Sequence, residues 1–147
     1  MAIHFFFKEV KNIRLNRRRE LKTFITHLFR AEDKIVGSLS YIFCDDITLL
    51  SINQDYLQHN YLTDIITFDL STRDGVVDGE AYVSIERVTE NAKVYKVSFE
   101  EELHRVIFHG ALHLCGFKDK HPADRKIMRK REQNYLTSYF RHVPRIT

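Results

Sequence analysis

The chain has 147 residues, of which 44% are hydrophobic and 29% are charged. This ordinary globular mixture excludes a collagen-like, low-complexity or highly charged disordered chain, and the length predicts one compact domain over residues 1–147. The formal net charge is only +3, which permits an anionic partner without requiring one.

Cysteine content and apolar segments bear on where the protein works. The two cysteines, Cys44 and Cys115, are too few for a disulfide framework. No N-terminal stretch has the basic, apolar and small-residue order of a signal peptide. No apolar run approaches the roughly 20 residues that span a bilayer. We therefore expect a cytoplasmic protein that does not enter a membrane.

The first half of the chain alternates between strand-like and helix-like patterns. Short runs rich in β-branched and aromatic residues predict strands, and apolar residues at spacings of three and four predict helices. Either Asp45 or Asp46 could cap the second helix. The predicted elements are a strand at 3–7, a helix at 16–31, a strand at 34–43 and a helix at 47–57.

The second half predicts two further strands, at 63–70 and 81–85, followed by helices. Turns are expected at Asp74-Gly75 and Asp78-Gly79. The helical pattern over 86–115 is broken near Ser98, where Ser98-x-x-Glu101 resembles a capping box, and Gly116 ends it. A last helix follows Pro122. We expect an α+β fold, a mixed sheet of about four strands covered by about five helices in a single domain.

The segment from His109 to His121 carries the clearest chemical signal. Residues four apart share one face of a helix, so His109 and His113 can present two imidazoles to one metal ion. Gly116 lets the chain turn back, and Asp119 or His121 can then supply a third ligand. Three protein ligands leave a fourth tetrahedral position open, as a catalytic Zn²⁺ requires for water or substrate.

Two other interpretations compete with a catalytic metal site of this kind. The histidines could be core residues without a metal, since a His-x-x-x-His pair also arises by chance. The spacing also echoes certain zinc proteases, which place a glutamate directly after the first histidine as general base. Here that position is Gly110, which argues against peptide hydrolysis but leaves other zinc hydrolases open.

Together these segments resemble the YbeY family of endoribonucleases, which act as rRNA maturation factors. His109 to Phe117 reads HGALHLCGF, which is similar to the family's His-Gly-x-Leu-His-Leu-x-Gly-Tyr-Asp-His signature. Upstream, Ile52-Asn53, Tyr56 and the TDIITF run at 63–68 resemble a second family segment. The likeness covers roughly residues 35 to 136, with Met128 and Glu132 where the family has Met and Glu in its last helix.

The resemblance implies a zinc-dependent, single-strand-specific endoribonuclease with one Zn²⁺ per chain. It implies a role in 16S rRNA 3′-end maturation and ribosome quality control. The implied partners are single-stranded RNA, chiefly rRNA, and ribosomal proteins or a ribosome-associated GTPase. The metal ligands would be His109, His113 and Asp119, which stands where the family's third ligand is histidine, with His121 as the alternative.

One departure concerns catalysis. The family's Tyr-Arg pair, whose arginine is thought to hold phosphate, is Tyr56-Leu57 here, and His59 or Arg105 is a candidate substitute. The alternative function is therefore a zinc-containing ribosome-assembly factor with little catalytic activity. No residue stands out as general acid or base, so the catalytic residues are unassigned, and Asp64 is a candidate acceptor behind a metal-bound histidine.

Overall fold

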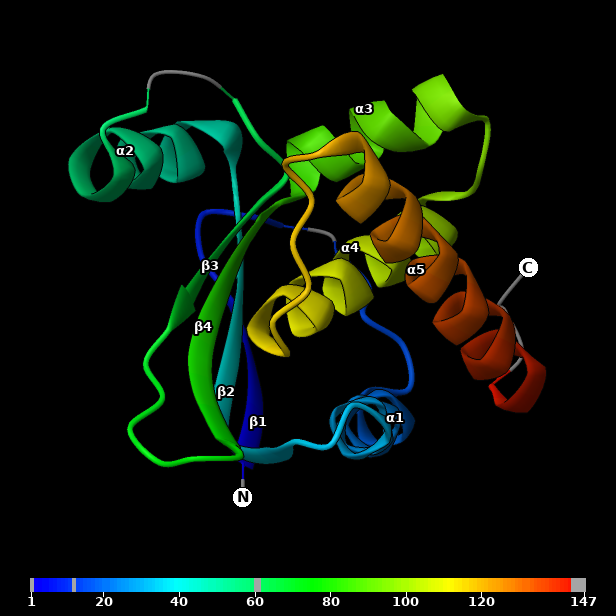
Figure 1. The fold of residues 1–147 in the computed structure, drawn as a ribbon. Helices are drawn as coiled ribbons and strands as arrows, with labels where there is room; N and C mark the ends of the chain where they lie inside the picture. Colours follow the sequence, from blue (N-terminus) through cyan, green and yellow to red (C-terminus); the bar gives the residue numbers. More distant parts are fainter. Residues whose placement is uncertain (1, 12, 60–61, 144–147) are drawn as a thin grey trace.

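The computed structural model describes residues 2–11, 13–59 and 62–143, which contain four strands and five helices, with the last three helices following the last strand (Figure 1). This composition confirms the predicted α+β class. In chain order the elements are β1 (Ala2–Phe7), α1 (Arg18–Ala31), β2 (Ile35–Cys44), α2 (Asp46–Leu57), β3 (Ile65–Asp69), β4 (Val76–Ser84), α3 (Ile85–Tyr95), α4 (Phe99–Leu114) and α5 (Pro122–His142).

The four strands form one mixed sheet in the order β1-β2-β4-β3. β1 runs parallel to β2, and β2 runs parallel to β4, whereas β3 pairs with β4 antiparallel. Helix α1 supplies the crossover that two consecutive parallel strands need. This order, which the sequence pattern alone did not give, leaves β3 at one edge of the sheet.

Helices cover the two faces of the sheet unequally. In Figure 1, α1, α4 and α5 lie on one side of the sheet and α2 lies on the other. The larger core fills the first side, where the buried Tyr41 hydroxyl donates a 2.8 Å hydrogen bond to the carbonyl of Ile107 on α4. A smaller cluster of Cys44, Leu49 and Ile66 is buried on the second side. Among the described residues, no helix has both the length and the apolar character needed to cross a bilayer.

Side-chain caps fix the starts of the helices that frame the site. Asp45, one of the two predicted candidates, accepts a 2.8 Å hydrogen bond from the Thr48 N–H and caps α2. The predicted break near Ser98 is confirmed, because the Ser98 hydroxyl accepts from the Glu101 N–H at 3.0 Å and starts α4. The long helical pattern is therefore two helices, α3 and α4.

One turn prediction is wrong. Asp74-Gly75 does form a turn, with Gly75 at a φ of 74°, but Asp78 and Gly79 lie inside β4, which begins five residues earlier than the predicted strand. The Asp78 carboxylate accepts a 2.8 Å hydrogen bond from the Ser38 N–H on β2. A Cβ at Gly79 would lie 2.9 Å from the carbonyl oxygen of Phe68, so the glycine serves close strand packing.

Candidate metal centre and its pocket

The two histidines of the predicted site lie one turn apart on α4. Their ring centroids are 4.5 Å apart, and both side chains are partly buried, at 16% exposure for His109 and 25% for His113. The helix begins at the Ser98 cap and carries acidic residues in its first turn, where their negative charges interact favourably with the positive end of the helix dipole. A capped helix thus sets the spacing of the two imidazoles.

Gly110 brings this part of α4 close to the sheet. A Cβ at this position would lie 2.6 Å from Ile65 Cδ1 and 3.5 Å from Thr67 Cγ2, both on β3. A larger residue would have to displace Ile65, whereas glycine allows the helix to lie directly on the edge strand. The residue that distinguishes the motif from zinc proteases therefore also places His109 and His113 beside β3.

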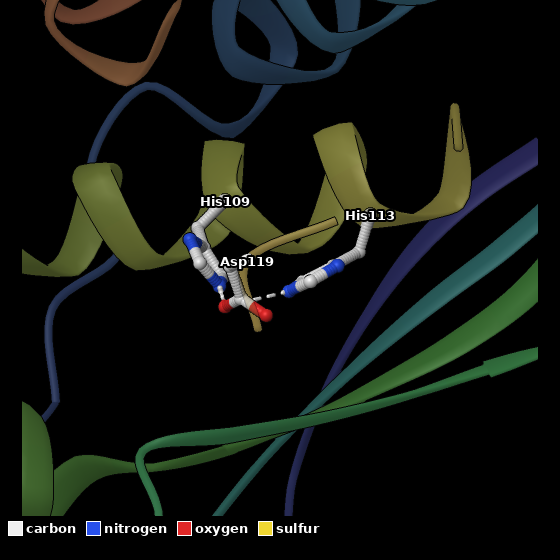
Figure 2. A group of neighbouring side chains, drawn as sticks. All are labelled: His109, His113 and Asp119. Carbon is white, nitrogen blue, oxygen red and sulfur yellow. Dashed lines mark hydrogen bonds and ion pairs between the residues drawn. The ribbon is translucent and has the colours of Figure 1, made fainter. Parts of the chain in front are cut away.

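The chain turns back after α4 and brings a carboxylate between the histidines (Figure 2). Gly116 adopts a φ of 107°, a left-handed conformation that favours glycine at a helix end. Asp119 Oδ2 lies 3.2 Å from Nε2 of His109 and 3.1 Å from Nε2 of His113. Three potential ligand atoms, one from each residue, lie within 4.8 Å of one another.

Of the two predicted candidates for the third position, the structure brings Asp119 to the histidines. Within the described ranges, His109, His113 and Asp119 form the one group of His, Cys, Asp and Glu side chains close enough to hold a metal ion. His121 instead occupies the N-cap position of α5, where it is exposed and is not part of the group.

The far side of each imidazole also has a partner. His113 Nδ1 lies 2.9 Å from the carbonyl oxygen of Phe117, which can only accept, so Nδ1 carries the hydrogen. His109 Nδ1 contacts Glu132 Oε2 on α5. A neutral imidazole that donates through Nδ1 directs the lone pair of Nε2 toward the centre of the group. This arrangement is the one that metal-binding histidines adopt, so the donor set fits a divalent metal.

Glu132 is the contact that the sequence did not assign. Only 3% of the residue is exposed, although it lies on a helix rich in exposed cations. Burial alone would raise the pKa of Glu132, but His109 and Arg105 outweigh burial and hold that pKa below its ordinary value. Its position four residues after buried Met128 places it on the packed face of α5, which is the only local signal of its role.

A hollow of about 380 Å³ opens beside the metal-binding group. Its wall combines the three candidate ligands with the end of α2, the segment leading into β3, and the loop after α4. The lining residues are Asn53, Leu57, His59, Thr63, Asp64, Ile65, Ile66, Thr67, His109, His113, Asp119 and Lys120.

Asp64 lies in the wall of this hollow rather than against an imidazole nitrogen. Its Oδ2 accepts a 3.1 Å hydrogen bond from the Asn91 side chain and lies 3.8 Å from Nη2 of Arg105. Burial raises the pKa of Asp64, against the opposing charges of Arg105 and His109. The carboxylate that contacts a histidine of the candidate metal group is therefore that of Glu132 and not that of Asp64.

Leu57 and the two residues suggested in place of the family's arginine occupy different positions. Leu57 and His59 both line the hollow. The backbone N–H of His59, just past the end of α2, donates a 3.0 Å hydrogen bond to the Asn53 carbonyl. Arg105 is not among the lining residues, and its guanidinium is bound to Glu102 and Glu132. The structure therefore places His59, and not Arg105, at the wall of the pocket.

Comparisons with known proteins find relatives over most of the chain. The family model described as endoribonuclease YbeY matches residues 6–140. A Flavobacterium psychrophilum protein named endoribonuclease YbeY is 53% identical over 112 residues, covering 76% of this chain and 79% of that protein. A Cytophaga hutchinsonii protein of the same name is 43% identical over 133 residues, covering 90% and 93% of the two chains.

A solved structure extends the likeness to the fold. The solution structure of a Thermotoga maritima protein superposes with a TM-score of 0.63 at 27% identity, covering 97% of this chain and 94% of the other. The family match spans every described element from the end of β1 to α5, including the three side chains that meet between α4 and the loop after it. The chain belongs to the endoribonuclease YbeY family.

Proposed function

We propose that this chain is a zinc-dependent endoribonuclease that cleaves single-stranded RNA, with His109, His113 and Asp119 as the metal ligands. The observation that carries the metal assignment is the pair of Nε2 atoms that face one carboxylate oxygen at 3.2 and 3.1 Å. Three protein donors leave room for water or substrate at a fourth position. A bound divalent metal would supply Lewis-acid chemistry at a phosphoryl oxygen and make water more acidic.

The hollow beside the ligands supports a polynucleotide substrate. Lys120 lines the hollow next to Asp119 and places a cation where a phosphate would enter. Asn53 in the last turns of α2 and His59 just after it add polar groups to the wall of the hollow. Exposed cations on α5, among them Arg125, Lys126 and Arg129, would attract the RNA backbone without reading its sequence.

We further infer that the full chain, residues 1–147, acts as one unit in 16S rRNA 3′-end maturation and ribosome quality control. That substrate would place the protein in the cytoplasm, with ribosomal proteins or a ribosome-associated GTPase as partners. The support for this assignment is membership of the endoribonuclease YbeY family over residues 6–140.

Metal content per chain tests the metal site. Wild-type protein, purified without chelators and reloaded with zinc, should hold about one ion, and His113→Ala should hold little. His121→Ala is the matched control, since it removes a neighbouring histidine that lies outside the ligand group, and it should keep its metal. Equal, negligible metal in all three proteins would overturn the proposal.

Cleavage assays test the activity. The zinc-loaded wild type should cut a single-stranded RNA oligonucleotide faster than the same sequence in a duplex, and it should leave casein intact. His113→Ala should lose cleavage, and His121→Ala should retain it. Cleavage by both variants at the wild-type rate would separate the activity from the metal group.

A second candidate function, an assembly factor with little catalytic activity, is favoured by one observation. Among the described residues, the lining of the hollow contains the apolar Leu57, 40% exposed, and no arginine. On that alternative, zinc would hold the loop of Asp119 in place, and RNA would bind without being cut. The alternative requires full metal occupancy and tight RNA binding together with no cleavage of any single-stranded RNA.

A further inference from the structure

A chain of buried polar contacts lies behind His109. Arg105, one turn earlier on α4, donates from Nε and Nη2 to the Glu102 carboxylate at 2.8 and 2.6 Å. Its Nη1 donates to Glu132 Oε1 at 2.8 Å. The other oxygen of Glu132 contacts His109 Nδ1. A continuous path therefore runs from Glu102 through Arg105 and Glu132 to a candidate metal ligand.

The two glutamates depend on Arg105. The residues Glu102 and Glu132 are only 1% and 3% exposed, so water cannot solvate their charges. Within the described part of the chain, Arg105 is the only lysine or arginine in a salt bridge with either carboxylate. Burial lowers the pKa of Arg105, but the two carboxylates outweigh burial and raise it above its ordinary value. Arg105 is thus a permanent cation between two buried anions.

The same guanidinium connects α4 to two other helices and to the segment before β3. It reaches Glu132 on α5, lies 3.8 Å from Asp64 just before β3, and lies over the ring of Tyr95 at the end of α3 at 5.9 Å. Asp64 belongs to the wall of the hollow. A planar group with five N–H donors can satisfy several carboxylates at once, which an ammonium on a flexible stem cannot do in the same geometry.

We propose that Arg105 is a positioning residue that fixes the Glu132 carboxylate, so that Glu132 holds His109 with Nε2 directed toward Asp119. The proposal rests on the proposed function in taking His109 as a metal ligand. Without Arg105, the Glu132 carboxylate would lack its cation and could rotate away from Nδ1 of His109. The imidazole would then lose its fixed orientation and single tautomer.

A role as a direct contact to RNA phosphate makes different predictions. An arginine that binds phosphate would change KM for RNA and its dependence on salt, and it would leave metal affinity intact. A positioning arginine changes metal affinity in the absence of RNA. The contacts favour the second role, because Nε, Nη1 and Nη2 of Arg105 all donate to buried carboxylates.

The first measurement is zinc affinity, by competition with a chromophoric chelator at one fixed pH without RNA. Arg105→Gln should bind zinc about 10-fold more weakly than the wild type, the low end of the range for loss of a direct partner of a metal ligand, because Arg105 acts on His109 through Glu132. Arg105→Lys keeps the positive charge but lacks the planar guanidinium, so its zinc affinity should lie between those of Arg105→Gln and the wild type. The matched control is Arg87→Gln, which removes a partly buried arginine that contacts both oxygens of Asp46, away from the hollow. Its zinc affinity should equal that of the wild type.

The second measurement needs no metal and separates this inference from the proposed function. Long-range proton–nitrogen NMR spectra of metal-free protein report the tautomer of His109. The wild type and Arg87→Gln should show Nδ1 of His109 carrying a hydrogen throughout, and Arg105→Gln should show Nδ1 protonated in only part of the molecules. If Arg105→Gln does not fold, Arg105→Lys takes its place in both measurements.

Either of two results would overturn the positioning role. One is zinc affinity in folded Arg105 variants within about twofold of the wild type, with an unchanged His109 tautomer. The other is an equal loss of affinity in Arg87→Gln, which would assign the effect to general destabilisation. A wild type that binds no zinc would contradict the proposed function alone, since the tautomer measurement would still decide the contact through Glu132.

Discussion

His104 should make the protein less stable in mild acid by a predictable amount. The residue is 2% exposed on α4, its ring stacks on Tyr139 at 5.1 Å between centroids, and its Nδ1 lies 2.7 Å from the Glu100 carbonyl. Its Nε2 is buried and has no hydrogen-bond partner among the described residues. Burial therefore lowers the pKa of His104 from 6.5 to about 4.

The direction of the effect follows from proton binding in the two states. Above pH 6.5 His104 is neutral in both the folded and the unfolded protein, so it adds no pH dependence. As the pH falls from about 6.5 to about 4, the unfolded chain takes up a proton that the folded protein excludes, and stability falls. A gap of about 2.5 between the two pKa values corresponds to a loss of about 3 kcal/mol.

Urea unfolding of the wild type and His104→Leu over this pH range measures the effect. Leucine has nearly the same volume and cannot titrate, and all other ionisable groups are common to both proteins, so the difference isolates His104. The free energy of unfolding of the wild type should fall about 3 kcal/mol further than that of the variant between pH 7 and pH 4. Parallel pH profiles would refute the assignment of His104 as a neutral core residue.

Three further changes test how the site is framed. Gly110→Val should cost about 1–3 kcal/mol, because its Cβ would lie 2.6 Å from Ile65 Cδ1 and valine gains little over glycine in helix propensity, and a double-mutant cycle with Ile65→Ala should recover part of that cost. Ser98→Ala should cost about 1 kcal/mol in urea unfolding through loss of the hydrogen bond from the Glu101 N–H. Gly116→Ala should cost at least about 1 kcal/mol in a thermal melt, since it forces a residue with a side chain to adopt a φ of 107°. Unchanged stability in any of the three variants would contradict the physical reason given for it.

Local patterns predicted most of the elements because each one carries its own signal. Apolar spacing identified all five helices, and the Ser98 and Asp45 caps set where two of them begin. The Asp78-Gly79 prediction failed because turn propensity cannot detect a partner strand. Asp78 bonds to β2 and Gly79 packs against Phe68, two contacts that exist only once the sheet is assembled.

Sequence spacing could predict only the part of the site that lies on α4 and the turn after it. His109 and His113 are four residues apart and Asp119 follows within six, so their convergence is a local event that the motif encodes. Glu132 and Arg105 are 27 residues apart and meet because α5 packs against α4. Spacing along the chain contains no information about that contact, and the basic composition of α5 gives no reason to expect a buried glutamate among its cations.

The chain provides its own comparison between a core histidine and the proposed ligands. His104 has aromatic rings around it, one hydrogen bond to a helix carbonyl, and a buried Nε2 with no partner in the described structure. His109 and His113, on the same helix, each have an acceptor at Nδ1 and a shared carboxylate oxygen at Nε2. Core packing explains the first environment. It does not explain two imidazoles aimed at one carboxylate, whereas a divalent cation at the centre would bond to both nitrogens and offset the negative charge of Asp119.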